Sequence, residues 1–379
     1  MSRIDNDGGI YYFLGNITSH VLHALPLYQE LGGTFVVLSK KAKREVETYG
    51  VPVISVDNKL YRWIRFGKKI KPVSHYTKID SSLKKTVEYL ESHARVVIFY
   101  ELYDFDKSVR LNQPKTVFLT HGNMLKDYMS QNGRLETIKQ YDYMSALGPY
   151  LKRQFIDSGI SNKKLVDLGI ARTDEVVKHQ GKVVAPQALI KETGINPHKK
   201  IVAYLPTFWG ASSIYTTGLE IVKNIPDDYT LLFRPHPQTP AKLLREYLRI
   251  IEQKDNVVYA PEGRYENLGL IDIFNASSAI IGDVSSVMLE AILTRKPLLF
   301  AYDTGSNKQS DSDYVSIKEV VEKSERIDMD TVADLPDILR HSVKNGVDQR
   351  LWTQVIDRNF YHADGTSVDA IKKFVQSLL

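Results

Sequence analysis

Short runs rich in Val and Ile alternate with helical patterns along most of this chain, and this alternation restricts the possible folds more than any other feature. The alternation is typical of a parallel sheet wound with helices, so the expected fold class is α/β. We expect the tail from residue 317 onwards to be helical. The predicted strands cover residues 10–14, 34–38, 51–56, 96–100, 116–120, 143–147 and 164–168, then 200–205, 229–233, 256–259, 278–281 and 297–300.

The strands fall into two series, and 379 residues are enough for two domains with separate cores. Between the series, over residues 179–198, the periodic pattern weakens and glycines and prolines are interspersed. We place a linker there. The prediction is one Rossmann-like domain over residues 1–180 and a second over residues 199–379, with the last helix able to pack back on the first domain.

The composition excludes several classes of protein. The chain has no cysteine, which excludes a disulfide scaffold, a thiol nucleophile and a thiolate metal site, and which fits a reducing cytosol. No stretch approaches the roughly 20 apolar residues of a membrane span, and the polar N-terminus does not resemble a signal peptide. A net charge of +5 suits an anionic ligand or an anionic membrane surface. We therefore expect a cytoplasmic protein.

One stretch, residues 280–291, combines a strand end with a helix start. An apolar run is followed by a turn at Asp283, and Ser285 or Ser286 can cap the helix that follows. The unpaired N–H groups at a helix N-terminus, with two nearby hydroxyls, can bind an anion. Glu290, about one turn further, could then reach a ribose hydroxyl. The alternative is an ordinary capped helix in an α/β core.

Other polar residues also follow predicted strands, where open parallel sheets bind their ligands. His121 follows the strand over residues 116–120 and could exchange a proton near neutral pH, or could be structural. Thr207 offers a hydroxyl after the first strand of the second series. Arg234 and His236 follow the next strand, and prolines on both sides hold His236. A permanent charge beside a hydrogen-bond donor suits a phosphate group.

A basic and aromatic segment, residues 59–78, interrupts the first series and contains no acidic residue. Basic side chains mixed with aromatic ones suit an anionic bilayer surface, at about 1 kcal/mol for each basic group near the lipid. A solvated loop or an acceptor groove are the alternatives, and no nucleic-acid recognition module accompanies the segment. The residues that we expect to form this patch are Arg62, Trp63, Arg65, Phe66, Lys68 and Lys69.

Taken in order, several short motifs resemble the CDP-glycerol glycerophosphotransferase family, the teichoic-acid primases and polymerases of bacterial cell envelopes. The resemblance covers about residues 116–370. It implies a glycosyltransferase-B fold, in which two Rossmann-like domains face each other across a cleft and the C-terminal domain holds most of the nucleotide. The motifs are His121-Gly122, Leu205-Pro206-Thr207, Arg234-Pro235-His236-Pro237, Asp283-Val284-Ser285-Ser286-Val287, Ala301-Tyr302-Asp303 and Asp364-Gly365.

The resemblance also implies roles. His121 becomes the general base, His236 lies beside the donor diphosphate, and Glu290 lies near the ribose. Ser285 and Ser286 contact donor phosphate oxygens, and Thr207, Arg234 and Asp283 complete the expected donor-binding set. Three positions depart from the family pattern: Thr120 and Asn123 stand where tryptophan and threonine are usual, and Glu290 where aspartate is common.

The expected activity is transfer of glycerol phosphate, or a related alditol phosphate, from a CDP-activated donor to a hydroxyl of a lipid-linked or polymer acceptor. We expect no metal, no cofactor and no nucleic acid, and peripheral association with the inner face of the cell membrane. One alternative is a glycosyltransferase or a UDP-N-acetylglucosamine 2-epimerase, although the epimerase would show a Gly-Gly pair where Ser285 and Ser286 stand. Another is a non-catalytic nucleotide-binding module. The sequence leaves open the exact donor, the acceptor, the choice between primase and polymerase, and the oligomeric state.

Overall fold

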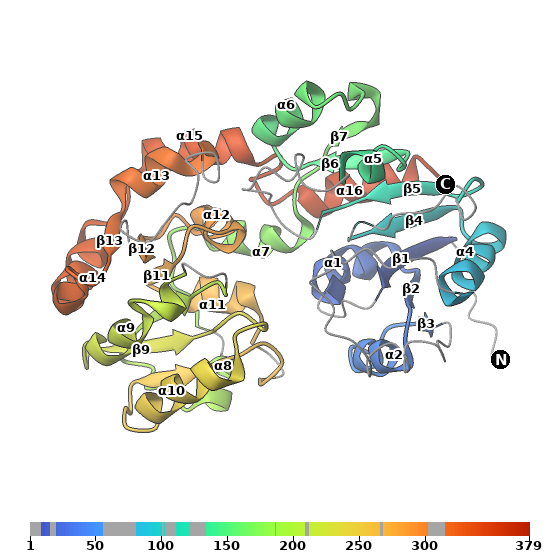
Figure 1. The fold of residues 1–379 in the computed structure, drawn as a ribbon. Coiled ribbons are helices and arrows are strands. Elements are labelled where there is room, and N and C mark those ends of the chain that lie inside the picture. Colours follow the sequence, from blue (N-terminus) through green and yellow to red (C-terminus); the bar gives the residue numbers. More distant parts are fainter. Residues whose placement is uncertain are drawn as a thin grey trace.

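Two parallel sheets with helices around them form the two lobes of the protein (Figure 1). The computed structural model describes residues 9–15, 20–55, 81–100, 102, 111–120, 134–185, 187–208, 212–265, 268–301 and 315–379.

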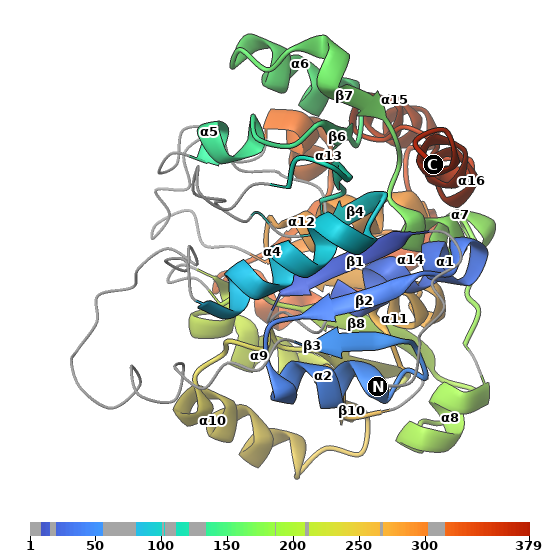
Figure 2. The ribbon, with the colours of Figure 1, turned by 90° about the vertical axis from the view of Figure 1, so that its right-hand side faces the viewer.

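The N-terminal lobe contains a seven-stranded sheet in the order β3-β2-β1-β4-β5-β6-β7, and every pair of neighbours is parallel. Figure 2 shows the strands β1, β2 and β3 side by side. The strands are β1 (Ile10–Gly15), β2 (Thr34–Val37), β3 (Val53–Ser55), β4 (Val96–Phe99), β5 (Lys115–Phe118), β6 (Tyr143–Ala146) and β7 (Leu165–Asp167). Its helices are α1 (Val21–Leu31), α2 (Lys40–Glu47), α4 (Ser81–His93), α5 (Arg134–Ile138), α6 (Pro149–Asp157) and the short turn η2 (Asn162–Lys164).

The C-terminal lobe contains a six-stranded parallel sheet in the order β10-β9-β8-β11-β12-β13. Both sheets therefore have a central first strand and a reversal of strand order beside it, as in doubly wound Rossmann folds. The predicted α/β class with two Rossmann-like units is confirmed. The strands are β8 (Lys200–Leu205), β9 (Tyr229–Phe233), β10 (Val257–Tyr259), β11 (Ala279–Gly282), β12 (Leu298–Ala301) and β13 (Glu325–Ile327).

The helices of the C-terminal lobe lie between and after these strands. They are η4 (Ser213–Tyr215), α9 (Gly218–Asn224), α10 (Ala241–Ile251), α11 (Leu270–Ala276), α12 (Ser286–Ala291), η5 (Ile292–Thr294), η7 (Val315–Ile317), α13 (Lys318–Lys323), η8 (Val332–Asp334), α14 (Leu335–Asn345), α15 (Gln349–Asn359) and α16 (Ser367–Gln376).

Alternate residues of the strands face opposite sides of the sheet, which explains why both faces need helices. On one face, Tyr11 and Phe13 of β1 belong to the same cluster as Val87 and Leu90 of α4. On the other face, residues of β1 pack with residues of α1 and α16 in a second cluster. Strands buried on both faces must be almost continuously apolar, and all six residues of β1 are buried.

The chain crosses between the lobes through η3 (Ala171–Thr173), α7 (Asp174–Lys178) and α8 (Gln187–Thr193). After α7, two backbone hydrogen bonds attach the chain to the C-terminal lobe. The N–H of Gly181 donates to the carbonyl of Thr294 at 2.8 Å, and the N–H of Val184 donates to the carbonyl of Asn275 at 2.8 Å.

The end of the chain returns to the N-terminal lobe. Helix α15 contacts α13 in one lobe and α6 in the other, and α16 lies on the N-terminal lobe (Figure 1). Phe374 of α16 makes an edge contact with Tyr143 (ring centroids 5.2 Å apart), and Lys372 forms an ion pair with Glu30 at 2.7 Å.

Two glycines permit this close approach. A Cβ atom at Gly169 would lie 2.2 Å from the hydroxyl of Ser367, and one at Gly148 would lie 2.1 Å from the backbone of Asn359. Any side chain at these positions would displace the returning segment.

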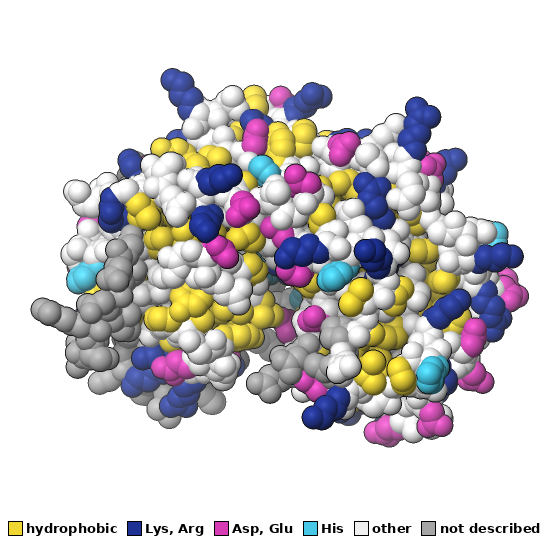
Figure 3. Space-filling view, turned by 180° about the vertical axis from the view of Figure 1, so that it is seen from behind, with side chains coloured by type: hydrophobic (Ala, Val, Ile, Leu, Met, Phe, Trp, Pro, Cys, Tyr) yellow, Lys and Arg dark blue, Asp and Glu magenta, His cyan; other side chains and the backbone are white. Residues whose placement is uncertain are grey.

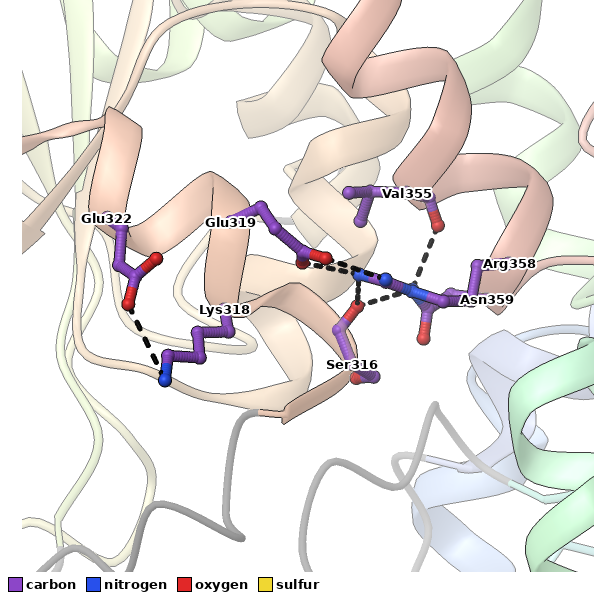
Figure 4. Close-up of polar contacts among 7 residues, drawn as sticks. All are labelled: Ser316, Lys318, Glu319, Glu322, Val355, Arg358 and Asn359. Carbon is purple, nitrogen blue, oxygen red and sulfur yellow. Dashed lines mark hydrogen bonds and ion pairs between the residues drawn. The ribbon is translucent and has the colours of Figure 1, made fainter.

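A polar clamp fixes α15 to α13 (Figure 4). The guanidinium of Arg358 donates to both carboxylate oxygens of Glu319, at 2.9 and 2.6 Å, and to the carbonyl of Ser316 at 2.6 Å. The amide of Asn359 donates to the same carbonyl at 2.9 Å. This bidentate geometry holds the C-terminal end of α15 onto the C-terminal lobe, just before the chain crosses over.

The structure corrects one prediction, that the tail from residue 317 is wholly helical. Residues Glu325–Ile327 form β13, which pairs with β12 at the edge of the sheet. The strand is three residues long and two of them are charged. Such a segment carries no apolar pattern, since an edge strand exposes part of its surface.

Several predicted features fall on residues that the structure does not describe. The basic and aromatic patch over residues 59–78 and the predicted base His121 both lie outside the described residues. Within the described ranges, no helix is long and apolar enough to cross a membrane. On the face drawn in Figure 3, basic and acidic side chains are interspersed over both lobes.

Candidate active site

The carboxyl ends of β9, β8 and β11, three neighbouring strands, carry most of the predicted donor-binding residues. Thr207 follows β8, Arg234 and His236 follow β9, and residues 283–286 follow β11. The strand order reverses between β8 and β11, and open α/β sheets bind ligands at such a reversal. The fold therefore brings together residues that are up to 79 positions apart, from Thr207 to Ser286.

Asp283 is buried, with 3% of its surface exposed, and both of its carboxylate oxygens accept backbone hydrogen bonds. One accepts from the N–H of Thr207 at 2.6 Å and the other from the N–H of Ser213 at 2.7 Å. Burial raises the pKa of Asp283 to about 6, and these hydrogen bonds oppose the shift. Asp283 thus fastens both ends of the loop that follows β8, and through this loop it sets the position of Thr207.

The two serines at the start of α12 have different surroundings. Ser285 is the N-cap residue, and its hydroxyl accepts the N–H of Met288 at 3.3 Å. Ser286 is the first residue of the helix and is exposed. Gly282 before them has no room for a side chain, because a Cβ atom there would lie 2.8 Å from the sulfur of Met288.

Arg234 and His236 occupy the irregular segment after β9. Arg234 donates to the carbonyl of Leu268 at 3.1 Å; burial lowers the pKa of its guanidinium, and the positive charge of Arg172 adds to that effect. The ring of His236 stacks on Phe208, with centroids 4.2 Å apart. Phe208 therefore supports a candidate site residue.

The contacts of His236 restrict its protonation. Its Nδ1 accepts the backbone N–H of Gln238 at 3.1 Å, so the neutral ring carries its proton on Nε2. Burial lowers the pKa of His236, which favours this neutral form. His236 can therefore donate a hydrogen bond through Nε2 without being charged.

Glu290 lies where the two lobes meet. Its side chain is 1% exposed, and its Oε1 accepts from Nη2 of Arg172 at 2.7 Å. Nη1 of the same guanidinium lies 3.0 Å from Nε2 of His23, in α1. A guanidinium only donates, so this nitrogen of His23 must accept, and the ring is neutral with its proton on Nδ1.

Sequence reasoning missed Arg172 and His23. Arg172 lies a few residues beyond β7, so the strand-end rule that found Arg234 would also have indicated it. His23 lies inside α1 and carries no comparable signal. Of the other predicted residues, His121 lies outside the described part of the chain. Within that part, no group of three His, Cys, Asp or Glu side chains is arranged to hold a metal ion.

Two curated relatives match parts of this chain. The teichoic acid glycerol-phosphate primase of Bacillus subtilis is 26% identical over 171 residues, which is 43% of this chain and 40% of the relative. The teichoic acid glycerol-phosphate transferase of Staphylococcus aureus is 26% identical over 187 residues, 46% of this chain and 44% of the relative. Each alignment thus spans less than half of either protein.

A solved structure and a family model match far more of the chain. The wall teichoic acid polymerase TagF covers 97% of this chain with 88% of its own, at 15% identity and a TM-score of 0.65, and it shares the fold. The model of the CDP-glycerol:poly(glycerophosphate) glycerophosphotransferase family matches residues 56–377. Because that match covers more than half of the chain and includes the whole C-terminal sheet and all the candidate residues of the C-terminal lobe, this chain belongs to the CDP-glycerol:poly(glycerophosphate) glycerophosphotransferase family.

Proposed function

We propose that this protein transfers glycerol phosphate, or a related alditol phosphate, from a CDP-activated donor to a hydroxyl of an acceptor in teichoic-acid-like or capsular polymer synthesis. The observation that carries the proposal is the family match over residues 56–377, together with Thr207, Arg234, His236 and residues 283–286 at the ends of three adjacent strands. In this proposal residues 1–180 form the acceptor domain and residues 199–379 the donor domain.

In the donor site, phosphate oxygens face the start of α12, with Ser286 exposed there and Ser285 as the cap. Arg234 supplies a permanent positive charge and His236 a neutral Nε2–H donor. As the phosphorus–oxygen bond to CMP breaks, negative charge grows on the leaving oxygen, and these groups stabilise it. Asp283 acts through the loop after β8, since both of its carboxylate oxygens accept backbone N–H groups there.

On the acceptor side, His121 takes the proton of the attacking hydroxyl as that oxygen attacks the glycerol-bearing phosphorus. The acceptor is lipid-linked or a growing polymer, and the patch from Arg62 to Lys69 holds the protein at the cytoplasmic face of the membrane. Both assignments come from the family pattern and the sequence.

A nucleotide-sugar transferase is the second candidate, because the same fold class serves it. The serines at positions 285 and 286 and the family match favour an alditol phosphate donor instead. A non-catalytic nucleotide-binding module is the third candidate, and turnover distinguishes it.

The test is to offer the purified protein CDP-glycerol, CDP-ribitol, UDP-glucose and UDP-N-acetylglucosamine, each with a lipid-linked glycerol phosphate primer, and to measure the nucleotide released. We expect CMP release from a CDP-alditol that depends on the primer. Release of UDP from a nucleotide sugar would replace the proposal with the second candidate, and no release from any donor would favour the third.

A further inference from the structure

The pair Arg172–Glu290 joins the two lobes at a buried position. Arg172 comes from η3, at the crossing between lobes, and Glu290 from α12 of the C-terminal lobe. The side chains are 15% and 1% exposed. Because the two side chains are buried and come from different lobes, the pair is part of the interface between the lobes.

The guanidinium of Arg172 is held on both sides. Nη2 donates to Oε1 of Glu290 at 2.7 Å and Nη1 donates to Nε2 of His23 at 3.0 Å. A planar guanidinium that is hydrogen-bonded on two sides has a fixed orientation. Arg172 therefore also fixes the carboxylate of Glu290.

The second oxygen of Glu290 is the unusual atom of this arrangement. Oε2 is buried and has no hydrogen-bond partner within the described residues. A buried carboxylate oxygen without a partner is costly, and native proteins keep few of them. Glu290 belongs to α12, the helix whose N-terminus faces the proposed phosphates. The positive charge of Arg172 also lowers the pKa of Arg234, a residue of the proposed donor site.

We propose that Arg172 is a positioning residue for the donor: it fixes Glu290 so that Oε2 accepts a ribose hydroxyl of the CDP-activated donor. This inference rests on the proposed function. Its consequence is that the N-terminal lobe contributes to nucleotide selection through a side chain that does not contact the nucleotide.

The test measures how the full-length protein binds CDP, 2′-deoxy-CDP and 3′-deoxy-CDP by calorimetry. In the unaltered protein we expect at least one deoxy analogue to bind roughly 10-fold more weakly than CDP, since one hydrogen bond to a charged group is lost. In Arg172→Ala we expect CDP to bind as weakly as that analogue, within about 2-fold. Glu290→Gln should show the same loss, and the double variant should lose nothing further, because both changes remove one interaction.

A control and a second variant separate positioning from general damage. Arg340→Ala removes another arginine–carboxylate pair, with Asp228 at 3.1 Å before β9, and should keep the preference for CDP. If Arg172→Ala does not fold, Arg172→Gln retains most of the side-chain volume and takes its place. Equal weakening of CDP and both analogues in the Arg172 variant would overturn the assignment and leave a structural role. If the unaltered protein binds no CDP, the proposed donor is wrong and the assignment falls with it.

Discussion

Asp283 and Glu290 are both almost completely buried, yet their oxygens have different partners. Both oxygens of Asp283 accept backbone N–H groups, whereas one oxygen of Glu290 accepts from Arg172 and the other has no partner in the described residues. The first carboxylate shapes a loop, and the second keeps one buried oxygen whose hydrogen-bonding capacity the described residues leave unused. The sequence could not distinguish them, because Thr207 and Arg172 lie 76 and 118 positions away from their partners.

The titration of Asp283 gives the first prediction at this scale. Its folded-state pKa of about 6 lies above the value near 3.9 of an unfolded aspartate, so the folded protein binds the proton more tightly between pH 4 and pH 6. The contribution of Asp283 to stability is therefore present below about pH 4 and is lost as the pH rises through 6. Relative to the unaltered protein, Asp283→Asn should gain roughly 1–3 kcal/mol of unfolding free energy from pH 4 to pH 7.

Denaturant unfolding of both proteins at each pH measures this difference, and comparing the two cancels the titration of all other groups. If the difference in unfolding free energy between the two proteins did not change with pH, the two backbone hydrogen bonds would offset the burial of the charge. We expect the same variant to lose donor affinity, since an amide has one oxygen and can accept from only one of the two loop N–H groups.

His236 gives the second prediction. His236→Ala should lower turnover about 100-fold or more with the fold intact, because the Nε2–H donor is lost. Burial lowers the pKa of His236. The fall in kcat/KM that accompanies its protonation should therefore occur below about pH 6.5, the pKa of an ordinary histidine. Steady-state rates from pH 5 to pH 8 measure both effects.

Gln238→Ala is the matched control, since His236 contacts only the backbone N–H of that exposed residue. A His236→Ala variant as active as Gln238→Ala would remove His236 from the site.

At the level of secondary structure, the strongly patterned elements were predicted most accurately. The strands Lys200–Leu205 and Tyr229–Phe233 have the expected bounds. Buried strands of a parallel sheet are apolar throughout and are therefore easy to recognise. The strand β13 was missed because only its last residue is buried.

The position of α16 gives the third prediction. Asp174 caps this helix from another part of the chain, accepting the N–H groups of Ser367 at 3.1 Å and Val368 at 2.9 Å. Asp174→Ala should lower the free energy of unfolding by roughly 1–2 kcal/mol, as the loss of a cap does. It should also speed hydrogen exchange at the first amides of α16, which mass spectrometry can follow.

The matched control is Asp369→Ala, an exposed aspartate in the first turn of the same helix. If the two variants exchanged at the same rate, the cap from Asp174 would not hold α16 in place.

For the whole molecule, the continuity of the core shows how the lobes are joined. One hydrophobic cluster includes Phe118 of the N-terminal sheet, Ile201 of the C-terminal sheet and Trp352 of α15. The two-unit organisation was predictable because each series of strands is local in sequence. The packing of the two units against each other was not predictable, because it depends on residues 83 to 234 positions apart.

The fourth prediction concerns the proposed membrane patch. The protein should bind liposomes that contain anionic lipid, and binding should fall as salt rises, because ions screen charges beyond about 8 Å near physiological ionic strength. Replacing Arg62, Arg65, Lys68 and Lys69 by glutamine should abolish binding in a flotation assay and spare hydrolysis of a soluble donor.

Helix α2 provides the control, with four basic residues of its own at Lys40, Lys41, Lys43 and Arg44. Glu45 and Glu47 pair with two of these lysines, so the same glutamine replacements there should not reduce binding. Liposome binding that survives the first set of replacements would exclude the patch as the anchor, and a loss of soluble activity would assign it to the acceptor groove.

The return of α16 to the N-terminal lobe has a consequence for protein synthesis. Ile371 and Val375 complete the cluster that covers one face of the first sheet, together with Val21 and Leu27 of α1. On the ribosome, α1 emerges more than 300 residues before α16. The first lobe to be made must therefore wait, with an apolar face open, until the whole second lobe has been translated. During that interval this surface is a binding site for chaperones and a risk for aggregation.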